Sequence, residues 1–77
     1  KPNFEGAVYE IRNSKDEVVG TIITDSSGFG RIDNLAPDQY RLIEKEAPSG
    51  YLINSEEIIV NATPEDDKLV NYEFYDR

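Results

Sequence analysis

The sequence predicts an all-β domain, a small antiparallel β-sandwich, and three observations lead to that prediction. Hydrophobic residues fall into short runs that alternate with polar ones, turn-forming residues separate the runs, and no apolar period of a helix persists. Two packed layers are the usual way for such strands to bury one face each. Because the two faces of each strand differ, we expect antiparallel sheets with one face in water.

Each expected strand ends at a cluster of turn-forming residues. The strands are expected, in chain order, at residues 7–12, 18–24, 29–32, 40–46, 51–53, 56–60 and 69–77. A polar turn at 13–17, a turn at 25–28, a loop at 33–39, a stop at 47–50 and an acidic connection at 61–68 separate them. Gly20 interrupts a β-branched run and therefore marks a bulge or a close approach of another segment.

The length and the missing residue types limit what the chain can be. Its 77 residues, of 8.7 kDa, predict a single domain over residues 1–77. A domain this small buries only about 60% of its unfolded surface, so its stability is marginal without a cross-link. The chain has no Cys and no His, which excludes a disulfide, a thiolate or histidine metal site and a Ser-His-Asp triad within it. The chain begins with Lys1 rather than Met, which we interpret as an excised or processed segment, and its apolar runs are too short for a signal peptide.

The charge argues against two classes of partner. Sixteen acidic residues against eight basic ones give a net charge of -8, which disfavours nucleic acid and anionic membranes. The longest purely apolar runs have three residues, so no membrane insertion is expected. The acidic run at 65–67 lacks the spacing of a calcium-binding loop and is interpreted as a solvated turn. Neither a metal nor a cofactor is therefore expected.

Two carboxylates stand at unusual positions. Glu44 continues an apolar stripe that begins at Tyr40, and Asp76 continues the stripe of the last strand through Phe74. Both acids could simply lie at strand ends in solvent. Alternatively, two carboxyl groups in one site of low dielectric share a proton, and a protonated carboxyl can condense with an uncharged lysine amine.

A run of matching motifs extends over nearly the whole chain. The longest has the pattern Y-x-L-x-E-x-x-A-P-x-G-Y, matched by Tyr40, Leu42, Glu44, Ala47, Pro48, Gly50 and Tyr51. Residues 6–11 fit G-A-x-F-x-L with Tyr9 at the aromatic position, 24–28 fit T-D-x-x-G, 35–40 fit L-x-P-G-x-Y, and 74–76 close the last strand. In these motifs the sequence resembles the Cna B-type (SpaA-like) domains of Gram-positive surface adhesins and pilins.

The resemblance implies both a fold and a reaction. The fold is an immunoglobulin-like or transthyretin-like (prealbumin-like) β-sandwich. The reaction is a spontaneous isopeptide bond between Lys and Asn or Asp, which a Glu promotes. By position, Glu44 matches the promoting acid, a proton shuttle, and Asp76 matches the acceptor. Such a bond forms once per molecule, so the domain is not expected to be an enzyme.

Two departures from the family pattern concern a turn and the lysine. Asp38 replaces the usual Gly, so the turn needs either a left-handed Asp or another turn type. The family's reactive Lys precedes the G-A-x-F-x-L strand, but only residues 1–5 precede Gly6 here. Lys1 resembles the end of the first hairpin, and a Lys1–Asp76 bond stays an alternative. The remaining lysines fit the donor position poorly; they are Lys15, Lys45 and Lys68.

The sequence thus predicts the acid and the acceptor of the bond without an evident donor. The first strand would be missing because the domain was cut at a motif boundary, is half of a split protein, or is a variant without the bond. The first functional interpretation is a stalk or spacer domain of a cell-wall-anchored adhesin or pilin on the bacterial surface, next to neighbouring domains of the same protein.

Three other functions compete with the stalk. A covalent peptide-capture protein would react at Asp76 with a Lys-bearing first-strand peptide, because an open sheet edge accepts a strand from another chain. A binding module would contact a host matrix protein such as collagen. A hydrolase using Glu44 and Asp76 would need a sugar cleft, for which an 8.7 kDa sandwich has little room.

Overall fold

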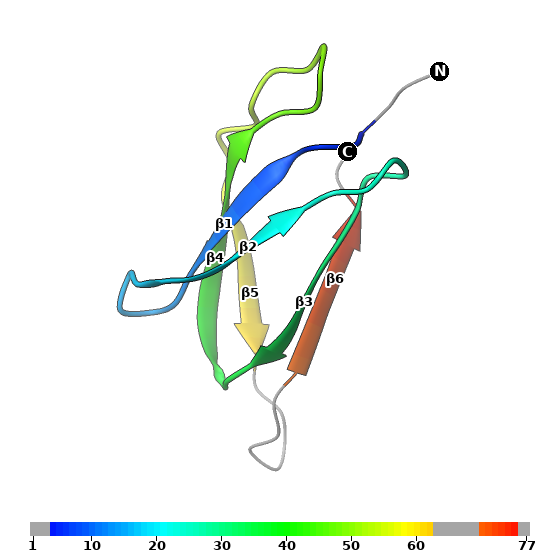
Figure 1. Ribbon diagram of the computed structural model, residues 1–77. Helices are drawn as coiled ribbons and strands as arrows, with labels where there is room; N and C mark the ends of the chain where they lie inside the picture. The colour runs from blue at the N-terminus through cyan, green and yellow to red at the C-terminus, as the bar shows by residue number, and fades with distance from the viewer. Residues whose placement is uncertain (1–3, 63–69, 76–77) are drawn as a thin grey trace.

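The computed structural model describes residues 4–62 and 70–75, and this part of the chain contains six β-strands and no helix. The strands are β1 (Val8–Arg12), β2 (Val18–Ile23), β3 (Phe29–Leu35), β4 (Asp38–Glu46), β5 (Ile58–Ala62) and β6 (Val70–Tyr75). One sheet has the order β2-β1-β4-β5, and β3 pairs with β6 in a second sheet (Figure 1). All pairs are antiparallel, so the predicted antiparallel β-sandwich is confirmed. Within the described ranges, no helix is available to cross a membrane.

The alternation of side chains along the strands decides what is buried. On β4, Tyr40, Leu42 and Glu44 face the other sheet and are buried, whereas Lys45 is exposed. The buried core consists of Ala7, Tyr9, Ile11, Ile22, Leu35, Tyr40, Leu42, Val60 and Ala62. Half-buried side chains from both sheets pack against it, namely Ile32, Ile58, Tyr72 and Phe74. The predicted inward stripe of β4, including its acid, is therefore confirmed.

Two glycines let the sheets approach each other. A Cβ atom on Gly20 would lie 2.8 Å from Cδ1 of Ile32, and one on Gly30 would lie 2.6 Å from Cγ2 of Ile22. The predicted close approach at Gly20 is confirmed. The bulge falls on its neighbour instead, because Ile11 pairs with Gly20 while the next residue of β1 pairs with Val18.

The prediction of a loop at 33–39 is wrong, because both flanking strands extend into this segment. β3 continues to Leu35, which pairs with the first residue of β6, and β4 already begins at Asp38. The pairing with β6 keeps this polar stretch extended across an irregularity where Asn34 adopts a φ of 64°. Asp38 is not left-handed, so this chain uses another turn type. The Tyr40 hydroxyl closes the turn by donating to the Ala36 carbonyl oxygen at 2.5 Å.

The prediction of a strand at 51–53 is also wrong. The N–H of Tyr51 donates to the carbonyl of Pro48 at 3.0 Å, and Gly50 has a φ of 88°, so the chain turns here. The segment stays a loop up to Ile58, where β5 begins two residues later than expected. No neighbouring strand pairs with this exposed loop, and its apolar residues alone do not make it extended.

We predict that Gly30→Ala lowers the free energy of unfolding by about 1–3 kcal/mol, because the added methyl group overpacks the contact between the sheets. It would collide with Ile22 and also lie 2.8 Å from Cε1 of Phe74. Urea denaturation of both proteins measures the change. As a control, Ser26→Ala alters only an exposed turn residue and should stay near wild type. Equal stabilities of the Gly30 variant and the wild type would contradict the close packing of the sheets.

Candidate functional site

The described part of the chain has one buried carboxylate in its core layer, that of Glu44 near the end of β4. Glu44 as a whole residue is 6% exposed. Its Oε1 accepts a hydrogen bond of 2.6 Å from the backbone N–H of Asn54, in the loop between β4 and β5. A hydrogen bond to a charged acceptor is among the stronger ones in proteins, so this bond offsets part of the cost of burying the acid. It also ties the loop to the sheet.

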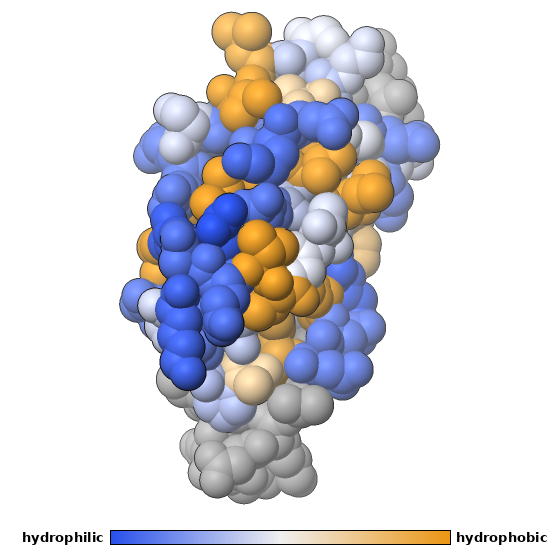
Figure 2. All heavy atoms as spheres, turned by 60° about the vertical axis from the view of Figure 1, so that its left-hand side comes forward, coloured by the Kyte–Doolittle hydropathy of each residue, from blue (hydrophilic) through white to orange (hydrophobic). Residues whose placement is uncertain are grey.

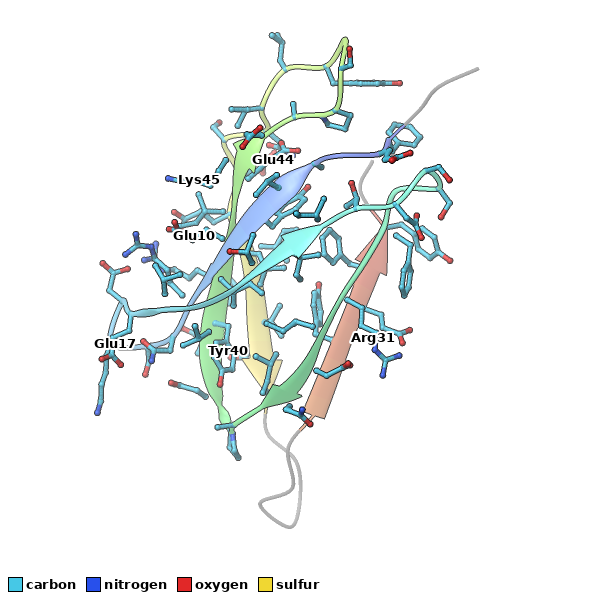
Figure 3. The ribbon with its side chains drawn as sticks, in the orientation of Figure 1. Glu10, Glu17, Arg31, Tyr40, Glu44 and Lys45 are labelled. Carbon is cyan, nitrogen blue, oxygen red and sulfur yellow. The ribbon has the colours of Figure 1, made fainter. Side chains whose placement is uncertain are left out.

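Aromatic rings connect Glu44 to the last strand. In the pairing of β1 with β4, Tyr9 lies directly opposite Glu44. The ring of Tyr9 meets that of Phe74 edge-on, with centroids 4.9 Å apart, and Phe74 stacks with Tyr72 at 5.9 Å. Figure 3 shows Glu44 at the end of β4 that borders the loop to β5. Phe74 lies one residue before the end of β6, so its contact with Tyr9 brings this end of β6 close to the residue that pairs with Glu44.

The orientation predicted for the last strand holds over its described side chains. Tyr72 and Phe74 are half-buried against the core, whereas Glu73 and Tyr75 are exposed. Period two would place Asp76 on the side of Phe74. Asp76 itself lies outside the described residues, so its role as acceptor stays a prediction.

Neither lysine in the described ranges lies beside Glu44. Lys45 is exposed on the opposite face of β4, as predicted, and Figure 3 shows it directed away from the other sheet. Lys15 is exposed in the turn between β1 and β2, which lies at the other end of the sandwich (Figure 1). The two other candidate donors, Lys1 and Lys68, lie outside the described residues.

A buried threonine fixes the segment that leads into β1, and the sequence analysis missed this role. Thr24 is 2% exposed, and its hydroxyl donates to the carbonyl of Phe4 at 2.6 Å and accepts the N–H of Ala7 at 2.9 Å. The ring of Phe4 lies 5.4 Å from that of Tyr51, between centroids. The motif T-D-x-x-G indicated only a turn there. The anchoring of Asn54 to Glu44 was missed too, because nothing local in the sequence identifies a backbone donor to a distant acid.

The surroundings of the core are suited to uncharged groups. Burial raises the pKa of Tyr72, and burial together with the charge of Asp38 raises the pKa of Tyr40. Both phenols therefore stay neutral at physiological pH. Among the described residues no group of three or more acids is placed to hold a metal ion. The acidic run at 65–67 lies outside them.

The fold and the site together define a class: a small antiparallel sandwich with an acid buried between its sheets. A family model, described as the SpaA prealbumin-like fold domain, matches residues 1–77. The chain therefore belongs to the SpaA prealbumin-like fold domain family, which confirms the resemblance to SpaA-like domains. No curated protein and no solved structure matched the chain.

We predict that Glu44→Ala lowers the free energy of unfolding by about 2–4 kcal/mol, whereas Glu44→Gln costs about 1 kcal/mol. Alanine leaves a cavity and removes the acceptor of the Asn54 N–H, while the glutamine carbonyl keeps that acceptor. Urea denaturation gives the stabilities, and hydrogen exchange of the Asn54 amide should accelerate most in the alanine variant. Glu46→Ala, at an exposed position of the same strand, serves as the control. Unchanged protection of Asn54 in Glu44→Ala would contradict the assigned bond.

Proposed function

We propose that the domain is a structural stalk module of a Gram-positive cell-wall-anchored adhesin or pilin, at the bacterial surface. In this proposal, Glu44 promotes a single isopeptide bond at Asp76. The observation that carries it is the burial of Glu44 between the sheets, next to the aromatic pair that leads to the end of β6. Membership of the SpaA family supports the stalk role.

The burial of Glu44 supports a chemical role over a purely structural one. A carboxylate in an apolar layer costs stability that an apolar side chain would not. Its neighbours on the β4 stripe, Tyr40 and Leu42, show that this face otherwise takes large, largely apolar side chains. One hydrogen bond to a loop N–H would be available at many less costly positions. A proton shuttle, in contrast, must stand where water is excluded.

The proposed reaction uses only groups of the protein. The uncharged amine of a lysine attacks the carboxyl carbon of Asp76, a C–N bond forms and a C–O bond breaks, and the hydroxyl leaves as water. Glu44 takes a proton from the attacking amine and returns it to the departing hydroxyl, so its own protonation state is restored. Each domain reacts once. In this proposal the domain is a self-modifying structural module and not an enzyme.

The lysine is proposed to come from a strand beside β6. The sheet of β3 and β6 has two strands, and in the described part of the chain the second edge of β6 has no neighbour. A strand added there would run next to Asp76, on the side of the molecule that carries Phe74 and Glu44. A cross-link between that strand and β6 would close the smaller sheet covalently. For a chain without Cys, it would have the role that disulfides have in other small domains.

The intact mass of the denatured chain tests the position of the donor. We expect the mass of the 77-residue sequence, because neither described lysine lies at Glu44. A mass lower by one water would instead identify an internal bond. If Asp76→Ala abolishes this mass difference, Asp76 is the acceptor. If Lys1→Arg or Lys68→Arg also abolishes it, that lysine is the donor, which would contradict a donor outside the chain.

Covalent peptide capture is the second candidate, favoured by the same free edge of β6. Its probe is a synthetic peptide of alternating Val and Thr with one central Lys. Incubation should give an adduct whose mass is the sum of both chains minus one water. Glu44→Gln should slow its formation by about 100-fold or more, the usual contribution of a positioned general acid–base group, and Asp76→Ala should abolish it. An equal adduct yield in all three proteins would exclude reaction at this site.

A further inference from the structure

The connection between β4 and β5 folds back onto the buried acid. It consists of residues 47–57, which we call the strap, and all of residues 49–57 are exposed. After the turn at Gly50 the chain returns, so that the N–H of Asn54 reaches Oε1 of Glu44 at 2.6 Å. Glu44 is buried although it lies only two residues before the end of β4. The strap therefore covers a site that the end of the strand would otherwise leave open to water.

Two further contacts hold the strap against the rest of the domain. Before Asn54, the ring of Tyr51 packs on the ring of Phe4, with centroids 5.4 Å apart. At the end of the strap, the carboxylate of Glu57 accepts a hydrogen bond of 3.0 Å from Nη1 of Arg41 on β4. This last pair is exposed to solvent and contributes little to stability. The contact with Phe4 and the bond to Glu44 are therefore the main attachments of the strap.

The middle of the strap gains almost nothing from burial. Leu52 is 94% exposed and Ile53 is 51% exposed, and no strand of the described chain pairs with this segment. Figure 2 shows apolar surface that projects at the top of the molecule, the end at which this loop lies in Figure 1. A segment with few buried contacts opens locally at a low cost in free energy. Loss of one attachment should therefore be enough to make the strap open more often.

Phe4 connects the strap to the segment that leads into β1. Its carbonyl oxygen accepts a hydrogen bond of 2.6 Å from the hydroxyl of Thr24, which directly follows β2. The same hydroxyl accepts the N–H of Ala7 at 2.9 Å, so residues 4–7 are fixed to a buried side chain. The ring of Phe4 is thereby held in place for Tyr51. The closed position of the strap depends on the packing of this leading segment.

We propose that the strap is a lid over Glu44 and that the contact between Phe4 and Tyr51 keeps it closed. Packing of the segment before β1 closes the lid, and release of this segment lets the strap open and admits water to the acid. The consequence for the reaction rests on the proposed function, in which Glu44 transfers protons. Closing of a loop over a reacting group excludes water from it. The closed strap, with residues 4–7 packed, is therefore the state in which the proposed reaction proceeds.

Hydrogen exchange of the Asn54 amide measures the opening of the strap. Under native conditions this amide exchanges when the strap opens and breaks the bond to Glu44. Phe4→Ala should accelerate its exchange by about fivefold to tenfold, because the aromatic contact is lost. Phe4→Tyr keeps the ring and should stay near wild type. The amide of Leu42, on an inner strand of the larger sheet, reports global unfolding and serves as the reference.

Phe29→Ala is the matched control for the loss of a ring contact. Phe29 is half-buried like Phe4, but its ring packs on that of Tyr75 on β6, with centroids 5.4 Å apart. Relative to the Leu42 amide, Phe29→Ala should leave the exchange of the Asn54 amide unchanged. Equal acceleration in the two alanine variants, or no acceleration in Phe4→Ala, would overturn the proposal.

Carboxyl labelling with a water-soluble carbodiimide and glycine ethyl ester tests whether opening exposes Glu44. Mass spectrometry should find Glu44 labelled slowly in the wild type and about fivefold to tenfold faster in Phe4→Ala, whereas labelling of the exposed Glu46 stays constant. The same ratio is expected when Asp76→Ala is added to both proteins. Because that variant cannot form the proposed bond, failure of the bond chemistry and failure of the lid are distinguishable. Labelling of Glu44 that Phe4→Ala leaves unchanged would overturn the lid.

Discussion

The close contact between the two sheets is the constraint on which the rest of this structure depends. It is made where Gly20 and Gly30 remove side-chain volume and where the ring of Tyr9 meets that of Phe74. Among the described residues the smaller sheet has two strands, and it is held mainly through this contact. Because Tyr9 also lies opposite Glu44, the same contact aligns β6 with the buried acid. The contact between the sheets thus determines both the packing of the core and the position of β6 relative to Glu44.

A buried carboxylate in so small a domain has consequences for stability and for function. The core is limited by chain length, and Glu44 occupies a position where an apolar residue would bury more surface. The Asn54 N–H compensates in part and fixes the loop between β4 and β5, whose Tyr51 in turn contacts Phe4. Glu44 is therefore connected to the loop between β4 and β5 and, through it, to the segment before β1. Once formed, the proposed cross-link would offset the stability cost of burying this acid.

Much of the fold could be predicted from the sequence, and the errors have a common physical cause. Alternation correctly oriented β4 with Glu44 inward, because period two leaves no other assignment once Tyr40 and Leu42 are buried. The predictions failed where tertiary pairing overrides local composition. Pairing with β6 extended β3 through the polar stretch before Leu35, while the apolar run at 51–53 has no partner strand. The Asn54 bond was unpredictable, because it joins a backbone group to a side chain ten residues away.

The central claim is that the end of β6 brings Asp76 to the carboxylate of Glu44. Nuclear Overhauser effects in the labelled protein test it most directly, since they report the proximity of the two side chains whether or not any bond has formed. The account predicts cross-peaks between the side-chain protons of Glu44 and those of Asp76, together with peaks from Tyr9 to Phe74. If Asp76 shows contacts only with exposed residues while the Tyr9–Phe74 peaks are present, the carboxyl groups do not share a site and the proposed chemistry is wrong.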